Sequence, residues 1–129
     1  MTEQFAHLEH VNFTVPDADR TAAMLGELFG WKIRWAGDMP GWGRSVHVGT
    51  DDEYVAIFSP AEGAKVADIN KQRVGHLNHV GIVVSDLDVV EKRVKDAGYK
   101  PHSHGDYEPG KRFYFDDENG IEFEVVSYD

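Results

Sequence analysis

Three ionisable side chains in this sequence could hold a cation together. His10 and His79 occupy matching places in two similar segments, and Glu124 lies near the C-terminal end. A carboxylate that is removed from water requires a cation, a proton or a water molecule as its partner. Two imidazoles and one carboxylate that meet at one place form a ligand set suited to a divalent metal ion. The predicted elements must therefore be able to bring these residues together.

The two similar segments show that the chain contains an internal duplication. The segment HLEHVNFTVPDAD begins at His7 and HLNHVGIVVSDLD begins at His76, an offset of 69 residues with seven of thirteen positions identical. Further along, GRSVHV at 43–48 matches GKRFYF at 110–115 at an offset of 67. Repeats of this kind indicate two copies of one structural unit.

Each copy has the pattern of a strand, a helix and three further strands. In the first copy, apolar and polar residues alternate from His10 to Val15, which is typical of a strand with one buried face. Helical spacing then continues to Gly30, a residue that often ends a helix. The later strands of the first copy are predicted at 31–36, 44–48 and 54–59, and the second copy predicts a strand at 78–84, a helix at 86–97 and strands near 99–103, 111–115 and 121–127.

One such copy cannot close its sheet around a core, so two copies must pair. We therefore predict an α+β fold in which two paired βαβββ modules form a cupped mixed sheet. The modules are expected at 1–60 and 76–129, with a polar linker at 61–75, and together they make one domain. A linker of this length lets the copies pack within one chain or exchange between two chains.

Strand alternation predicts which side chains share a face, because residues two apart point the same way. If Val11 and Phe13 pack on the helix, then Asn12 and the histidine before it face the concave side of the sheet. The same parity in the second copy sends Phe113 and Phe115 inward. The ionisable and aromatic side chains expected on the concave side are His10, His47, His79, Arg112, Tyr114, Glu122 and Glu124.

The composition excludes several classes of function. A net charge of −10 opposes binding to nucleic acid or to anionic membrane surfaces. The absence of cysteine excludes disulfides, thiolate metal sites and a cysteine nucleophile. No signal peptide or membrane-spanning segment is recognisable, so a cytoplasmic location is expected.

With these features the sequence resembles the vicinal oxygen chelate superfamily, which includes glyoxalases, extradiol dioxygenases, fosfomycin-resistance enzymes and bleomycin-binding proteins. In that family the first strand of each module supplies a histidine ligand and a last strand supplies a glutamate. His10 and His79 match the histidines, and Glu124 matches the glutamate that lies four residues after the glycine of a DPDG-like turn, here DENG at 117–120. The resemblance implies a divalent metal, with iron, manganese, zinc and nickel all compatible.

The counterpart of Glu124 in the first copy narrows the reaction class that the resemblance implies. At the offset of 67, Ile57 corresponds to Glu124 and cannot bind a metal. Two histidines and one carboxylate are the set of extradiol dioxygenases and fosfomycin-type transferases, which disfavours a lactoylglutathione lyase. Tyr114, ten residues before Glu124, matches a tyrosine found in both of these classes. Extradiol enzymes also use a histidine as acid or base, for which His102 or His104 is a candidate.

The remaining candidate site residues each have more than one interpretation. His47 either contacts substrate and moves protons or is a packed histidine. Glu122 supports the site and contacts substrate, forms a surface ion pair with Arg112, or binds the metal itself. Trp42 either lines a substrate pocket or belongs to a core or an interface. The candidate substrate-binding residues are Asn12, Trp42, Arg112 and Glu122, and the candidate catalytic residues are His47 and Tyr114.

We therefore expect a metal-dependent enzyme, either dioxygenase-like or a glyoxalase-like lyase or isomerase, whose small substrate binds the metal through paired oxygens. The alternative is a metal-free protein that binds a small molecule or antibiotic, as bleomycin resistance proteins do. A homodimer is expected from the resemblance.

Overall fold

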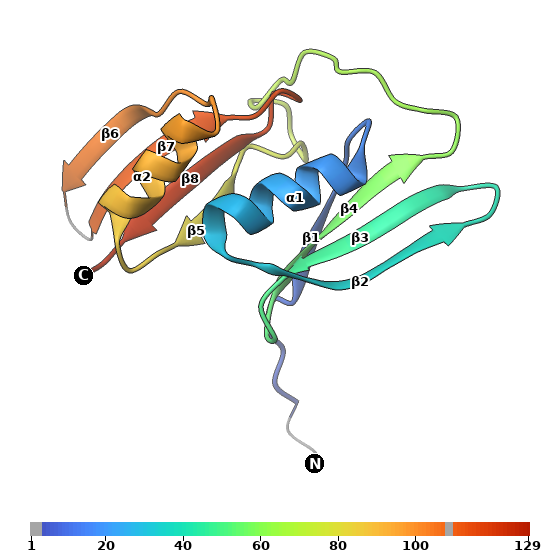
Figure 1. Ribbon diagram of the computed structural model, residues 1–129, viewed down its shortest axis with the longest axis horizontal. Helices are drawn as coiled ribbons and strands as arrows, with labels where there is room; N and C mark the ends of the chain where they lie inside the picture. Colours follow the sequence, from blue (N-terminus) through green and yellow to red (C-terminus); the bar gives the residue numbers. More distant parts are fainter. Residues whose placement is uncertain (1–3, 108–109) are drawn as a thin grey trace. The chain divides into compact units, whose positions relative to one another are not determined.

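The computed structural model describes residues 4–107 and 110–129 and divides the chain into two compact units, Met1–Lys65 and Val66–Asp129. Each unit has the element order βαβββ (Figure 1). The predicted α+β fold of two βαβββ modules is therefore confirmed. The partition into modules at 1–60 and 76–129 with a linker at 61–75 remains a prediction. Among the described residues, no helix has both the length and the apolar character needed to span a membrane.

Unit 1 is a mixed four-stranded sheet with one helix against it (Figure 1). The strand order is β1-β4-β3-β2, in which β1 and β4 are parallel and the other neighbours are antiparallel. The elements are β1 (His10–Thr14), α1 (Ala18–Phe29), β2 (Lys32–Met39), β3 (Gly43–Gly49) and β4 (Tyr54–Pro60).

Local signals explain the limits of α1. Asp17 caps its N-terminus, because its side chain accepts a hydrogen bond from the backbone N–H of Arg20 at 3.1 Å. Gly30 ends the helix in the left-handed region at a φ of 72° and donates its N–H to the carbonyl of Gly26. Between these ends, Leu25 and Leu28 are fully buried against the sheet.

Unit 2 repeats this arrangement with the strand order β5-β8-β7-β6. Asp86 caps its helix as Asp17 caps α1, accepting from the backbone N–H of Val89 at 3.2 Å. The elements are β5 (Val80–Val83), α2 (Leu87–Asp96), β6 (His102–Tyr107), β7 (Gly110–Asp116) and β8 (Glu122–Ser127).

The predicted strand near 99–103 is misplaced, because β6 runs from His102 to Tyr107. Pro101 precedes it and has no backbone N–H to offer to a ladder, so pairing with β7 starts after the proline. The pairing is also interrupted between His102 and Gly105, where Ser103 has a φ of 55°. This irregularity breaks the two-residue alternation of a regular strand at this point.

The predicted alternation is confirmed in β7 and β8. Phe113, Phe115 and Phe123 are fully buried on the side of the sheet that carries α2. Arg112 and Tyr114, which alternate with them, are partly exposed on the face opposite the helix. That face also receives Glu122 and Glu124 from β8.

The strand registers correct the expected counterpart of Glu124 in unit 1. Tyr114 pairs with Glu124 in unit 2, and the equivalent His47 pairs with Ala56 in unit 1. The connection between β3 and β4 is one residue shorter than that between β7 and β8, so an ungapped comparison selects Ile57 instead. Ile57 is fully buried in the core, because a shift of one residue changes the face of a strand. Ala56 has no donor atom either, so unit 1 still supplies no matching carboxylate.

Candidate metal centre

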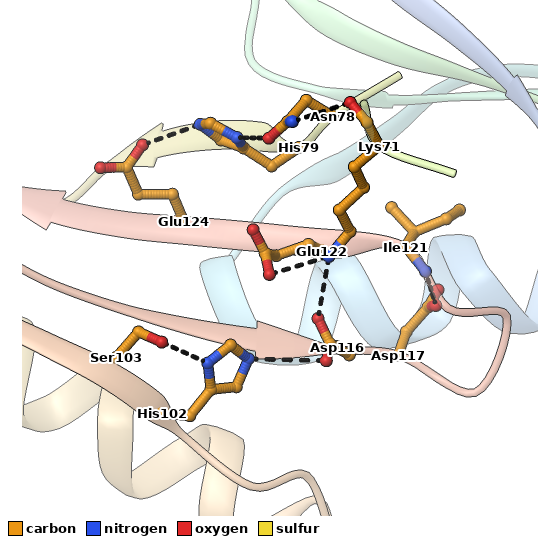
Figure 2. A network of polar contacts seen from close by, with 10 residues as sticks. All are labelled: Lys71, Asn78, His79, His102, Ser103, Asp116, Asp117, Ile121, Glu122 and Glu124. Atoms are coloured by element: carbon orange, nitrogen blue, oxygen red, sulfur yellow. Dashed lines mark hydrogen bonds and ion pairs between the residues drawn. The ribbon is translucent and has the colours of Figure 1, made fainter. Parts of the chain in front are cut away.

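His79 and Glu124 meet on the face of the unit 2 sheet opposite the helix. His79 immediately precedes β5, and Glu124 lies in the neighbouring strand β8. The Nε2 atom of His79 is 3.1 Å from Oε1 of Glu124 (Figure 2). The Glu124 side chain is only 13% exposed, so its charge requires a partner within the protein.

The separation of these two atoms fits two ligands of one metal ion. Bonds of about 2.1 Å from a metal ion to each donor place neighbouring donors roughly 3.0–3.4 Å apart. Without a metal ion, a proton between Nε2 of His79 and Oε1 of Glu124 is needed, because two lone pairs at 3.1 Å repel each other. The donor types and their spacing therefore suit a divalent ion in the position of that proton.

Arg112 holds the other oxygen of this carboxylate. Its Nη1 donates to Oε2 of Glu124 at 2.9 Å, and both side chains are largely buried. The guanidinium also lies over the ring of Tyr107, 4.9 Å from its centroid. Glu124 is thus fixed through Oε2 while Oε1 faces His79. The interpretation of Glu122 as an ion-pair partner of Arg112 is wrong.

The strand register explains why Arg112 binds Glu124 and not Glu122. Asp116 is the residue directly opposite Glu122, whereas Arg112 lies two positions from Tyr114, the partner of Glu124. A long side chain reaches its diagonal neighbour across two strands, so Arg112 meets Glu124. Lys71, from the segment before β5, binds Glu122 instead, with Nζ 2.9 Å from Oε2.

Tyr114 stands beside the histidine and the carboxylate. Its ring meets that of His79 edge to face, with 5.8 Å between centroids and 80° between planes. Burial, and next the neighbouring charge of Glu124, raise the pKa of Tyr114 above its usual value. The phenol is therefore protonated at neutral pH and available as a hydrogen-bond donor.

A second group of potential ligands lies on the same face. Donor atoms of His102, Asp116 and Glu122 all lie within 4.8 Å of one another. Between the two carboxylates lies the ammonium of Lys71, 2.9 Å from Glu122 and 3.9 Å from Asp116 (Figure 2). This group already has a cation that belongs to the chain, which offsets the repulsion between two carboxylates on opposed strand positions.

The structure separates the two acid–base candidates in β6. The ring of His102 stacks over Tyr114 with centroids 6.3 Å apart. His104 instead stacks on the buried Phe113, and its Nε2 is 2.9 Å from the Glu91 carboxylate on α2. Only His102 therefore lies on the face that carries Tyr114.

Unit 1 carries a row of rings on the corresponding face. His10 stacks on Tyr54, and Tyr54 stacks on His47, with centroids 4.9 and 4.7 Å apart. Trp35 continues the row beside His47 at 5.1 Å, and the Arg34 guanidinium lies 4.4 Å from the centre of the Tyr54 ring.

The pKa of His47, within this row, is shifted by its surroundings. Burial, and next the positive charges of His10 and Arg34, lower the pKa of His47 below its usual value. The ring is therefore neutral at pH 7 and can accept a proton.

The predicted site residues thus fall into two sets. Unit 2 brings His79, Arg112, Tyr114 and Glu124 together, with Glu122 bound to Lys71. Unit 1 holds the others.

In unit 1, His10 and His47 share the row of rings, and Asn12 lies two residues after His10 on β1. Trp42 is 74% exposed in the turn between β2 and β3. The assignment of His10, His79 and Glu124 to one metal ion remains a prediction.

Sequence reasoning missed two residues of the site, Lys71 and Asn78. The side chain of Asn78 contacts the Nδ1 atom of His79 at 2.7 Å, and its Nδ2 reaches the Lys71 carbonyl at 3.2 Å. The duplication held a signal for Asn78, because Glu9 has the same place before His10. No sequence pattern marks Lys71, since its contacts with β7 and β8 span many residues.

A family model described as the Glyoxalase/Bleomycin resistance protein/Dioxygenase superfamily matches residues 7–125. A comparison with curated proteins finds no match.

Solved structures show the same fold. A glyoxylase/bleomycin resistance protein/dioxygenase domain from Frankia sp. EAN1pec is 23% identical, with a TM-score of 0.81 over 96% of this chain and 98% of that one. The fosfomycin resistance protein FosX from Mesorhizobium loti is 24% identical, with a TM-score of 0.72 over 95% of this chain and 92% of that one. FosX from Listeria monocytogenes, complexed with Mn(II) and sulfate, is 18% identical, with a TM-score of 0.70 over 96% and 93%.

Proposed function

Because this chain belongs to the glyoxalase/bleomycin resistance protein/dioxygenase superfamily, we propose that it is a divalent-metal-dependent enzyme. Its substrate would be a small molecule that binds the metal through paired oxygens. The observation that carries this proposal is the 3.1 Å separation of His79 Nε2 and Glu124 Oε1, two donors on one face of a sheet. Members of the superfamily include metal-dependent enzymes, and one FosX structure contains Mn(II).

The proposed ligands are His10, His79 and Glu124. His10 enters the set through the duplication, since it has the same place in its module as His79. Two imidazoles and one carboxylate suit Fe²⁺, Mn²⁺, Zn²⁺ or Ni²⁺ and leave coordination positions open for substrate oxygens. A bound divalent ion would supply Lewis-acid stabilisation of negative charge on those oxygens.

The residues around the ligands have distinct proposed roles. Tyr114, held protonated by burial and by Glu124, donates a hydrogen bond to the substrate. His47, held neutral, accepts or passes on a proton. Arg112 holds Glu124 through Oε2 and offers its positive charge to a substrate oxygen.

Asn12 and Trp42 are proposed as further substrate contacts. Glu122 joins them only when Lys71 releases it, because the two are paired at 2.9 Å. We propose a homodimer in the cytoplasm as the form in which the protein acts. The reaction is either dioxygenase-like cleavage or a glyoxalase-like lyase or isomerase reaction.

A second candidate function is metal-free binding of a small molecule. One observation favours it: Arg112 and His79 already satisfy both oxygens of Glu124 within the protein. The stacked rings of unit 1, with Trp35 49% exposed, would then contact a planar ligand.

Turnover assays separate the two candidates. Protein loaded in turn with each of the four metals is tested for oxygen uptake with a catechol and for isomerisation of a hemithioacetal. The variants are Glu124→Ala and, as a matched control, His76→Ala, which removes an exposed histidine.

Turnover that is lost in Glu124→Ala and kept in His76→Ala supports the enzyme. The metal-free binding protein is supported instead if no metal gives turnover and if a planar aromatic dye still binds to His79→Ala.

A further inference from the structure

The Nδ1 atoms of both proposed metal-binding histidines are held by the residue immediately before them. Nδ1 of His79 lies 2.7 Å from Oδ1 of Asn78. Nδ1 of His10 lies 2.9 Å from Oε1 of Glu9. Asn78 and Glu9 are equivalent at the offset of 69, so the duplication has kept the contact while the residue type differs.

The orientation of the Asn78 amide follows from its second contact. Its Nδ2 lies 3.2 Å from the backbone carbonyl of Lys71, a group that can only accept a hydrogen bond (Figure 2). The amide nitrogen must therefore face Lys71, and the amide oxygen must face the His79 ring. Since an amide oxygen has no hydrogen to give, Nδ1 of His79 carries a proton, which is separate from the one between Nε2 and Glu124 in metal-free protein. The ion pair of Lys71 with Glu122 anchors this arrangement to β8.

The same reasoning applies to Glu9 in unit 1. An ionised carboxylate offers only lone pairs, so Nδ1 of His10 must be the donor. Oε1 of Glu9 also accepts a hydrogen bond from the Tyr54 hydroxyl at 3.2 Å, which fixes the carboxylate on the neighbouring strand β4. Each histidine thus receives its partner from a side chain that is itself held in place.

We propose that Glu9 and Asn78 are a duplicated pair of positioning residues that fix Nε2 of His10 and of His79 as the nitrogen presented to a metal ion. This inference rests on the proposed function in one respect, the identity of the ligands. A histidine that donates its other ring N–H to a fixed acceptor cannot turn its ring, and it is a stronger ligand. The carboxylate of Glu9 polarises its ring more than the amide of Asn78 does, so the two histidines are unequal ligands.

The test uses variants that remove or restore the acceptor. Asn78→Ala removes it, and Asn78→Asp restores an oxygen at the same place. Asn70→Ala is the matched control, because the side chain of Asn70 accepts an exposed hydrogen bond from the backbone N–H of Gln72 in the same segment. We expect Asn78→Ala to weaken metal binding by about 10–100-fold, Asn78→Asp to recover it, and Asn70→Ala to leave it unchanged.

A spectroscopic readout separates positioning from a general loss of structure. Nitrogen-15 NMR of metal-free protein detects the hydrogen-bonded proton on Nδ1 of His79 as a slowly exchanging signal. This signal should be present in the wild type, absent in Asn78→Ala and restored in Asn78→Asp, while the corresponding His10 signal stays unchanged. Glu9→Ala should have the reverse effect, with Glu9→Gln as its rescue.

A wild-type His79 without a proton on Nδ1, or an Asn78→Ala variant that keeps the protected signal, overturns the inference. The NMR measurement needs no metal. Failure of the wild type to bind any metal would therefore contradict the proposed function, and the ring proton would still decide the present inference.

Discussion

The two modules have the same backbone plan but opposite chemistry on the face away from the helix. Unit 1 presents stacked rings around His10, whereas unit 2 surrounds His79 with charged side chains. In the strand registers, Ala56 stands where unit 2 has Glu124, and Ser45 stands where unit 2 has Arg112.

This difference shows that a buried carboxylate on one copy of a duplicated module requires a cation on the same copy. Among the described residues, the two largely buried carboxylates on the unit 2 face each have a cation beside them, Arg112 for Glu124 and Lys71 for Glu122. Unit 1 has neither these carboxylates nor these cations, and its rings pack on one another instead. A largely buried carboxylate and its counter-charge are therefore present together in unit 2, whereas the charged groups beside the rings of unit 1, Glu9 and Arg34, belong to exposed residues.

The largest loss of stability is expected when a carboxylate is introduced into unit 1 at the position that corresponds to Glu124. Ala56 is 3% exposed, and Ser45 stands at the position that Arg112 has in unit 2. Ala56→Glu thus places a charge in a buried position with Ser45, instead of an arginine, diagonally across on β3. We expect the free energy of unfolding, measured with urea, to fall by about 3–5 kcal/mol.

The control for this change is Ala56→Gln, which has nearly the same size and no charge. A loss in Ala56→Glu that is no larger than the loss in Ala56→Gln would show that unit 1 tolerates the charge, contrary to the comparison.

Removing the cation from unit 2 should have the next largest effect. Arg112→Met takes the guanidinium away from the largely buried Glu124 carboxylate, so metal-free protein should lose about 2–3 kcal/mol of unfolding free energy. Arg34→Met in unit 1 removes a guanidinium that lies over the Tyr54 ring and should cost only about 0.5–1 kcal/mol. Thermal denaturation of the two variants side by side measures the difference. Equal losses would mean that the charges of unit 2 carry no more stability than the ring contacts of unit 1.

The smallest expected effect is the pH dependence that His47 contributes to unit 1. Its pKa is lowered in the folded protein, so the unfolded chain binds the proton more tightly. Stability is therefore complete above the ordinary value of 6.5 and falls as the pH drops from there towards the lowered pKa. In His47→Gln this part of the decline should be missing. Urea midpoints between pH 5 and 8 check it, with His7→Gln as the control.

Carboxylates such as Glu91 cannot produce the same signal. The pKa of Glu91 is lowered: burial raises it, but the contacts with His104 and Lys95 outweigh that effect. Its contribution is present above the ordinary value of 4.5 and is lost only at lower pH. A His47→Gln curve that is parallel to the wild type from pH 7 down to pH 5 would contradict the role given to His47.

Local patterns carried most of the fold prediction. Alternation in the strands correctly divided Phe113 and Phe115 from Arg112 and Tyr114, because the period of a strand is a local property. Gly30 also marked the end of its helix, where it adopts the left-handed conformation at a φ of 72°.

Features that depend on contacts between distant segments could not be predicted from local patterns. The counterpart of Glu124 was misassigned to Ile57 because the loop lengths of the two modules differ by one residue. The interpretation that paired Arg112 with Glu122 was wrong because a diagonal contact depends on the register of β7 and β8. The role of Lys71 had no sequence signal, since its carboxylate partners are more than forty residues away.

Elemental analysis of bound metal can show whether His79 and Glu124 share a divalent ion. Protein freed of metal is dialysed anaerobically against Fe²⁺, Mn²⁺, Ni²⁺ and Zn²⁺ in turn, and the bound metal is measured by elemental analysis. We predict about one tightly held ion per chain with at least one of these metals. The ion should be kept in His76→Ala and lost in both His79→Ala and Glu124→Ala. No stoichiometric ion with any metal, or an ion fully retained in Glu124→Ala, would contradict the account.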